Sequence, residues 1–319
     1  MKEELFIALF LFWGSVFLYF GAEFLIRGAT SLALRIGLPL VVIGLTIMGY
    51  GTGTPELVVS IQASLGGKGD IALGNVIGSN IANIGLVLGF TALCRPISVK
   101  RQLVRRDVPI MVVVSFALCL LFFFNHNITR WKGLLFFLGF LIYTVLSIYL
   151  GKKEKEIELE IEEEKKPHKI KNRWIELGFM AIGFLLLFLG GKLFLDGSIA
   201  LAKKFHISDA VIGLTVIALG TSLPEFATSV VAVMKRHEDI VLGNIVGSNI
   251  FNILAIVGIA ALIHPIQIVG INWIDYTFMT LLACFFWLIV RSGSKITRWE
   301  GALFLLSYVG YITYLVSTT

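Results

Sequence analysis

The sequence predicts an all-α membrane protein whose ten transmembrane helices form two inverted-topology repeats of five. Two observations carry this prediction. The first is composition: 57% of the 319 residues are hydrophobic and only 15% are charged, which suits a lipid bilayer rather than water as the solvent. The second is an internal repeat, because the first half of the chain recurs in the second half at a nearly constant spacing.

Apolar stretches long enough to cross a bilayer recur along the whole chain. About 20 residues of helix cross the hydrocarbon core, and residues 131–150 are one such stretch. The first stretch lacks a basic leader and a small-residue cleavage site, so we expect a retained span rather than a signal peptide. The expected spans are residues 5–27, 36–64, 71–93, 107–125, 131–150, 174–202, 208–234, 239–263, 272–291 and 297–316.

Two motifs repeat at the same offset. VIGLTIMGYGTGTPE ends at Glu56 and VIGLTVIALGTSLPE ends at Glu225, and 225 − 56 = 169. GNVIGSNIANI begins at Gly74 and GNIVGSNIFNI begins at Gly243, which is again 169 residues later. The register holds without a gap over residues 21–83, so we interpret the repeat as a duplication.

We therefore expect three parts. The first repeat is residues 1–151, with its motif region at about 44–90, and the second is residues 174–319, with its motif region at about 213–259. Between them, residues 152–173 contain the run KKEKEIELEIEEEKK, which is typical of a solvated loop or a short amphipathic helix. Because each repeat has an odd number of spans, the second enters the membrane from the opposite side, which is an inverted topology.

The distribution of Lys and Arg predicts the orientation in the cell (inner) membrane. The loops on the side of the charged linker carry most of the basic residues, so the positive-inside rule places the linker in the cytoplasm and both termini outside. The net charge of +6 is then explained by the basic residues in the loops between spans, and nucleic acid is not an expected partner. The three cysteines and five histidines are scattered without metal-ligand spacing, so we expect neither redox chemistry nor a zinc site.

Glu56 and Glu225 are the strongest candidates for a functional site, because each lies within an apolar span. A carboxylate in hydrocarbon is costly and by default functional. Each follows a proline, Pro55 or Pro224, which bends a membrane helix and frees a backbone carbonyl that can bind a cation. The alternative is a helix-packing carboxyl that stays protonated, but two copies at the same place in a repeat favour a functional role.

Other oxygen-bearing side chains are expected on the same helix faces. In each half a threonine stands four residues before the glutamate, and in the next span a serine stands four residues before an asparagine, so each pair shares a face. Carboxylates, amides and hydroxyls without a thiolate or an imidazole make a hard oxygen site that suits Ca2+ or Na+ rather than Zn2+ or Cu+. These side chains are Thr52, Ser79 and Asn83 in the first half and Thr221, Ser248 and Asn252 in the second.

At these motifs the sequence resembles the prokaryotic type of the sodium/calcium exchanger family, within the calcium/cation antiporter superfamily. The resemblance covers nearly the whole chain. It implies a secondary active antiporter that exchanges Ca2+ for Na+ by alternating access, with the first helix of each half sliding against a core bundle that holds the site. The implied metal ligands are Thr52, Glu56, Ser79, Asn83, Thr221, Ser222, Glu225, Ser248 and Asn252.

The resemblance implies no cofactor besides the transported ions and no partner besides the lipid bilayer; the oligomeric state stays open, a monomer included. Two residues depart from the family's motifs. Gly53 stands where the second repeat has Ser222, which bears on the number or affinity of Na+ sites, although Thr54 could compensate. Asn252 stands where some relatives carry an aspartate, which resembles potassium-independent exchangers and leaves two carboxylates in the site.

Three other function classes compete with this interpretation. An antiporter of the same fold that exchanges H+ for Ca2+ or another cation is the nearest, but such proteins typically carry a further acidic residue where this chain has Ser79 and Ser248. A passive cation channel would also line a path with oxygens, yet inverted repeats with broken helices are typical of alternating access. We find no nucleophile with a base and no P-loop, so we do not expect an enzyme or an ATP-driven pump.

Overall fold

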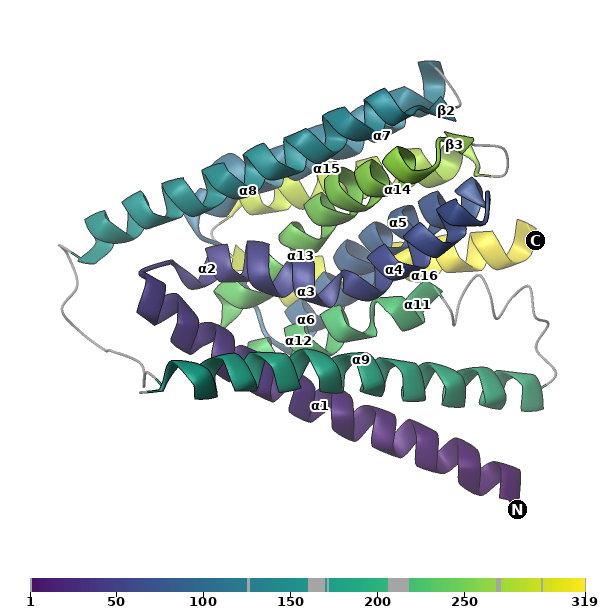
Figure 1. Cartoon of the computed structure of the whole chain (residues 1–319), viewed down its shortest axis with the longest axis horizontal. Coiled ribbons are helices and arrows are strands. Elements are labelled where there is room, and N and C mark those ends of the chain that lie inside the picture. The colour runs from purple at the N-terminus through teal and green to yellow at the C-terminus, as the bar shows by residue number, and fades with distance from the viewer. Residues whose placement is uncertain are drawn as a thin grey trace.

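The computed structural model describes residues 2–124, 127–159, 170, 172–205, 218–267, 271–293 and 295–318. This part of the chain is helical apart from short two-residue strands (Figure 1). Both termini lie at one end of the molecule, whereas the end of α8 and the start of α9, which flank the charged linker, lie at the other. Residues 160–169 and 171 of the expected linker lie outside the described residues.

The first repeat contains eight α-helical segments within its described residues, several of them joined end to end through π-helical turns. The π-helical turns are Gly44–Met48, Asn83–Leu88 and Leu103–Asp107. The α-helices are α1 (Lys2–Ile36), α2 (Leu40–Ile43), α3 (Gly49–Thr52), α4 (Thr54–Leu65), α5 (Gly69–Ala82), α6 (Gly89–Cys94), α7 (Val108–Phe124) and α8 (Arg130–Leu159), and the strands are β1 (Ile97–Ser98) and β2 (Asn127–Ile128).

The second repeat follows the same plan in the part that the structure describes. Its π-helical turn is Asn252–Ile256. The α-helices are α9 (Arg173–Lys204), α11 (Ala218–Thr221), α12 (Leu223–Met234), α13 (Glu238–Phe251), α14 (Val257–Ile263), α15 (Trp273–Ser292) and α16 (Arg298–Thr318), and the strands are β3 (Ile266–Gln267) and β4 (Lys295–Ile296). Residues 208–217 of the expected span 208–234 lie outside the described residues.

Seven helical stretches of the described chain are long and apolar enough to cross a membrane, and each matches an expected span. They are Glu4–Ile36, Gly69–Cys94, Arg130–Glu154, Arg173–Lys204, Glu238–Ile263, Trp273–Ser292 and Arg298–Ser317. The expected spans 36–64 and 208–234 include the shorter apolar helices Leu40–Thr52 and Leu223–Met234. The expected span 107–125 corresponds to α7, which has 17 residues.

Two helices run past the predicted boundaries. The expected first span ends at residue 27, but α1 continues to Ile36. It continues because the arginines beyond the apolar stretch find partners: Arg27 pairs with Glu23 one turn earlier, and Arg35 pairs with Glu176 of α9. Likewise α8 extends into the charged linker as far as Leu159, since Lys and Glu are good helix formers.

α1 and α9 cross along one edge of the molecule (Figure 1), and glycines bring their backbones into close contact. A β-carbon on Gly21 of α1 would lie 2.7 Å from the Leu187 amide nitrogen, and one on Gly190 of α9 would lie 2.7 Å from that of Leu18. Small residues at such a crossing let membrane helices pack at van der Waals distance. Gly14, Gly21 and Gly28 recur as Gly183, Gly190 and Gly197 at the offset of 169.

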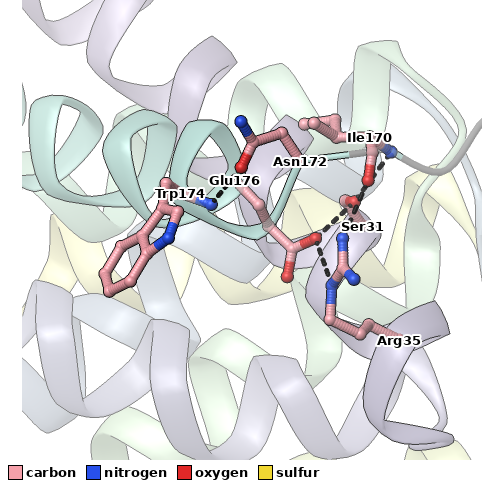
Figure 2. Close-up of polar contacts among 6 residues, drawn as sticks. All are labelled: Ser31, Arg35, Ile170, Asn172, Trp174 and Glu176. Atoms are coloured by element: carbon pink, nitrogen blue, oxygen red, sulfur yellow. Dashed lines mark hydrogen bonds and ion pairs between the residues drawn. The ribbon is translucent and has the colours of Figure 1, made fainter.

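A buried ion pair fixes the end of α1 to the beginning of α9 (Figure 2). Glu176 is fully buried, and its Oε2 accepts hydrogen bonds from Ser31 Oγ (2.8 Å) and Arg35 Nε (3.1 Å). Ile170 joins the cluster through its backbone, which donates to Ser31 Oγ and accepts from Arg35. The last described residues of the linker are therefore attached to both helices.

The core lies around α5, α13 and the π-helical turns that follow them. In the stretches Gly69–Cys94 and Glu238–Ile263, 78% and 89% of the most apolar window is buried, against 28% in the spans of α1 and α9. Two antiparallel strand pairs tie the halves together at the ends of the core, β1 with β4 and β2 with β3. Residues from both halves thus surround the centre of the molecule.

Candidate functional site

The candidate glutamates, Glu56 and Glu225, lie where two core helices are interrupted. Gly53 separates α3 from α4, and Ser222 separates α11 from α12. Each new helix has a proline as its second residue and a glutamate as its third. In the first turn the N–H that proline lacks would have no partner within the helix, and a negative charge faces the positive end of the helix dipole. The sequence GTxxPE therefore both breaks the helix and places a carboxylate at the break.

Glu56 is almost fully buried and accepts two hydrogen bonds on one oxygen. Ser222 Oγ donates to Glu56 Oε1 across 3.2 Å, and Ser79 Oγ donates to the same atom across 3.4 Å. The two hydroxyls are themselves 3.2 Å apart. The other carboxylate oxygen, Glu56 Oε2, is buried, and no described residue donates a hydrogen bond to it. A residue of the second half thus helps to orient the carboxylate of the first.

Glu225 is equally buried, with 1% of its surface exposed, but it is less constrained. Neither of its carboxylate oxygens accepts a hydrogen bond from the part of the chain that the structure describes. The hydroxyl side chains that face it are those of Thr52 and Ser248. The two glutamates, which correspond in the repeat, therefore differ in their hydrogen bonding.

Asn83 and Asn252 present amide oxygens to the same buried region. Their nitrogens are occupied, since Asn83 Nδ2 donates to Asn249 Oδ1 and Asn252 Nδ2 donates to Asn80 Oδ1, each across 3.0 Å. Their Oδ1 atoms are buried and have no hydrogen-bond partner in the described part of the chain. An unpaired buried acceptor is costly, and carboxylate and amide oxygens are what a hard cation requires. The donor set fits a cation such as Ca2+ or Na+.

Four further asparagines support these ligands, and the sequence prediction did not include them. Asn75 Nδ2 donates to the Glu56 carbonyl (3.1 Å), and Asn244 Nδ2 donates to the Glu225 carbonyl (3.5 Å). These are the carbonyls in the first turn after each break. The repeated Asn of the GN and SN dipeptides was the signal that could have identified these residues, which are Asn75, Asn80, Asn244 and Asn249.

The predicted threonines, Thr52 and Thr221, each form a hydrogen bond to a residue of the other half. Thr52 Oγ1 lies 3.2 Å from Asn244 Oδ1, and Thr221 Oγ1 lies 3.4 Å from Asn75 Oδ1. In each case the hydroxyl of one half donates to an asparagine of the other. Ser248 Oγ donates to the carbonyl of Gly49 (3.2 Å). Thr54 is exposed and donates to the carbonyl of Tyr50, so its hydroxyl is engaged away from the glutamates.

A cavity of about 470 Å³ lies beside the interrupted helices. Thr52, Thr54 and Pro55 line it from the first break, and Pro224 lines it from the second. Phe184 and Phe188 of α9 form its apolar wall. The cavity therefore adjoins residues that flank both glutamates.

Comparison with known proteins agrees with this arrangement of residues. The family model described as "Sodium/calcium exchanger protein" matches residues 6–149 and 175–317, which is nearly all of both repeats. The chain belongs to the sodium/calcium exchanger family. It is therefore a multi-pass membrane protein and a cation antiporter of this family, and the predicted resemblance is confirmed.

Similar proteins cover the chain almost from end to end. The putative antiporter CaxA of Alkalimonas amylolytica is 37% identical over 96% of this chain and 98% of its own length. The sodium/calcium exchanger MaX1 of Methanosarcina acetivorans is 32% identical over 96% and 97%. These family members are antiporters and exchangers rather than enzymes.

Solved structures of the sodium-calcium exchanger NCX_Mj share the fold of this family member. One of them, determined with Na+ and Sr2+, superposes with a TM-score of 0.83 at 29% identity, covering 97% of this chain and 98% of that one. The agreement extends over both halves of the molecule and is not confined to the motif regions.

Proposed function

We propose that the protein exchanges Ca2+ for Na+ across the cell membrane by alternating access, with Glu56 and Glu225 as the central cation ligands. The observation that carries this proposal is a set of buried oxygen atoms that have no hydrogen-bond partner among the described residues. They are Glu56 Oε2, both carboxylate oxygens of Glu225, and the Oδ1 atoms of Asn83 and Asn252. Two carboxylates balance one divalent ion, while the same oxygens could instead hold monovalent ions, which is the competition that an antiporter needs.

The remaining ligands of the proposed site are the hydroxyls of Thr52, Ser79, Thr221, Ser222 and Ser248. Ser79 and Ser222 are supported by their hydrogen bonds to Glu56. Thr52 and Ser248 are supported by their position facing Glu225. The weakest support is for Thr221, whose hydroxyl contacts Asn75 and could contribute through that residue.

We also propose ten transmembrane helices in two inverted repeats, 1–151 and 174–319, joined by the linker 152–173. Reciprocal contacts support a twofold relation between the halves, since Thr52 donates to Asn244 and its repeat equivalent Thr221 donates to Asn75. Both termini would lie outside and the linker in the cytoplasm, as the distribution of Lys and Arg favours. The common end of the two termini in Figure 1 fits that topology.

The two interrupted helices are covered unequally by the outer helices α1 and α9. α1 packs along α12, whereas α9 makes no comparable contact with α4 within the described residues. In an alternating-access cycle, the path along α12 would then be closed and the path along α4 open. The proposed transport therefore involves repacking of the α1–α9 pair against the core.

Transport of 45Ca2+ into proteoliposomes tests the proposal. Outward gradients of Na+ and of H+ are imposed in separate experiments, with the membrane potential clamped by ionophores. We expect uptake with the Na+ gradient alone. Uptake only with the H+ gradient would assign the protein to proton-coupled exchange, and downhill Ca2+ leak without any counter-ion would indicate a channel.

A further inference from the structure

Among the expected ligand positions of the repeated motifs, one differs between the two halves. Ser222 corresponds to Gly53, because 222 − 53 = 169. Both residues occupy the interruption between helical segments, with φ −76° and ψ 4° at Gly53 and φ −87° and ψ 6° at Ser222. These are ordinary angles for any L residue. The backbone would therefore accept a serine at position 53, and the glycine has to be explained by its surroundings.

Phe251 fills the space that a side chain at position 53 would enter. A β-carbon on Gly53 would lie 3.0 Å from Cδ1 and 3.2 Å from Cε1 of the Phe251 ring. At these distances the ring would have to move by a few tenths of an ångström. The residue that corresponds to Phe251 in the first half is Ala82, since 251 − 82 = 169. The second half has serine and phenylalanine where the first has glycine and alanine.

The ring of Phe251 is held by two other aromatic rings. It stacks on Tyr50, with ring centroids 5.0 Å apart and planes inclined by 22°, and it meets the edge of Phe140 at 5.6 Å. Tyr50 is in turn fixed to α8, because its hydroxyl lies 2.9 Å from Thr144 Oγ1. Three aromatic rings packed in this way resist displacement of any one of them.

The consequence is that position 53 offers Glu225 no hydroxyl of the kind that Ser222 offers Glu56. Ser222 donates to Glu56, and the twofold equivalent of that contact would join residue 53 to Glu225. Within the described residues Glu225 accepts no hydrogen bond, and Ser248, although it faces Glu225, donates to the carbonyl of Gly49. The repeat therefore builds two unequal half-sites from nearly the same motif.

We propose that Gly53 and Phe251 together determine cation selectivity by excluding a hydroxyl ligand next to Glu225. The Glu56 side, with Ser79 and Ser222, keeps the neutral oxygens that suit a monovalent ion. The Glu225 side offers a carboxylate whose two oxygens accept no hydrogen bond from the described residues, so both can contribute to the divalent ion that it shares with Glu56. This assignment rests on the proposed function. It predicts that Na+ binds more weakly, and with a less steep dependence on Na+ concentration, than it would to a site with a serine at both positions 53 and 222.

The test compares G53S/F251A with G53A/F251A, because these variants differ by a single hydroxyl oxygen. Purified protein in detergent is titrated with Na+, and the midpoint of thermal unfolding is followed, since a ligand stabilises the folded state that binds it. We expect the Na+ concentration for half-maximal stabilisation to be about fivefold lower in G53S/F251A. In G53S alone the Na+ concentration for half-maximal stabilisation should change little, since the Phe251 ring still occupies the space.

The same titration is repeated for Ca2+, and Na+-driven 45Ca2+ uptake is measured in proteoliposomes. A steeper Na+ dependence of uptake in G53S/F251A supports the proposal. Equal Na+ titrations of the two double variants would overturn it. Because the Na+ titration does not depend on transport, it stays decisive if uptake proves to be driven by H+, which would contradict the proposed function alone.

S222A provides a second test that needs no change at Phe251. It removes the hydroxyl of Ser222, whose counterpart in the first half is already absent at Gly53. The Na+ concentration for half-maximal stabilisation should therefore rise about fivefold. The Na+ titration of S222A tests the proposal even if the double variants fail to fold. An unchanged Na+ titration in S222A would show that this hydroxyl is no cation ligand, and the proposal would then fall.

Discussion

Asn80 and Asn249, which are 169 residues apart, each donate a side-chain hydrogen bond to the backbone carbonyl of the other. The two bonds measure 3.4 and 3.5 Å. Their Oδ1 atoms accept from the amides of Asn252 and Asn83, respectively. One network therefore sets the orientation of both asparagines that offer oxygens to the proposed cation site. Its symmetry yields a paired prediction.

Asn80→Ala should weaken cation binding through Asn252, and Asn249→Ala should do so through Asn83. Each change leaves a buried amide nitrogen without its acceptor, so the amide is free to rotate away from the site. We expect the concentration of Ca2+ for half-maximal uptake to rise about tenfold in either variant. Uptake kinetics in proteoliposomes measure this. An effect in one variant but not in the other would contradict a symmetric role.

Glu56→Gln and Glu225→Gln should each abolish exchange without unfolding the protein. Glutamine keeps the size of the side chain but removes a charge that a buried cation requires, and burying an amide costs less than burying a carboxylate. We expect no 45Ca2+ uptake, an unchanged or higher unfolding midpoint without ions, and loss of the stabilisation by Ca2+. Normal uptake in either variant would refute the site assignment.

Gly183→Ala should disrupt the packing of α1 on α9. Its β-carbon would lie 2.7 Å from the Leu25 amide nitrogen and 2.9 Å from the Leu25 α-carbon, so the helices would have to separate. Gly178→Ala, on the same helix, is the matched control, because a β-carbon there meets no described atom within 4 Å. We expect a lower unfolding midpoint and slower uptake for Gly183→Ala. Similar values for the two variants would contradict the importance of this contact.

Glu23→Gln should shift the balance between the two faces of the transporter. Glu23 of α1 pairs with Lys235 at the end of α12, and the corresponding positions of the repeat are Lys192 and Gly66, which cannot form this pair. The contact holds α1 against α12 in the arrangement observed here. We expect the ratio of apparent Ca2+ affinities at the two faces to change about threefold, as measured in oriented vesicles.

Charge reversal provides the control for that prediction. E23K/K235E restores an ion pair of opposite direction, so it should return the ratio toward the wild-type value. Arg27→Gln removes the other partner of Glu23 without touching α12 and should change the ratio less. Failure of the reversed pair to rescue would indicate that Glu23 acts through some other contact.

Glu176→Ala should destabilise the junction of α1, α9 and the linker shown in Figure 2. Removing one partner of a buried ion pair typically costs about 3–5 kcal/mol. Here Ser31 would lose its acceptor, whereas Arg35 is partly exposed and keeps its bond to the Ile170 carbonyl, so we expect a cost at or below the lower end of that range. We expect a clearly lower unfolding midpoint in detergent and easier proteolysis of the linker. Asn172→Ala removes only the cap of α9 and should lower the midpoint much less.

The sequence alone determined the membrane character and the duplication, and it singled out the two carboxylates that we propose as central ligands. These follow from local or periodic signals: the length of apolar runs, a constant offset of 169 residues, and acidic residues such as Glu56 that stand next to a helix-breaking proline. Such signals can be recognised without knowing which segments meet in space. For the same reason the predicted first span was too short, because it could not include Arg35, whose partner Glu176 is 141 residues away.

Only the tertiary structure decided how the equivalent residues of the two halves differ. Ser222 donates to Glu56 from the opposite repeat, and Phe251 takes the space beside Gly53 with the support of Tyr50 and Phe140. These contacts join residues up to about 200 positions apart, and their geometry depends on how large side chains fill one shared interior. A repeated motif specifies the kind of ligands, whereas the packing around it determines which of them remain free to bind an ion.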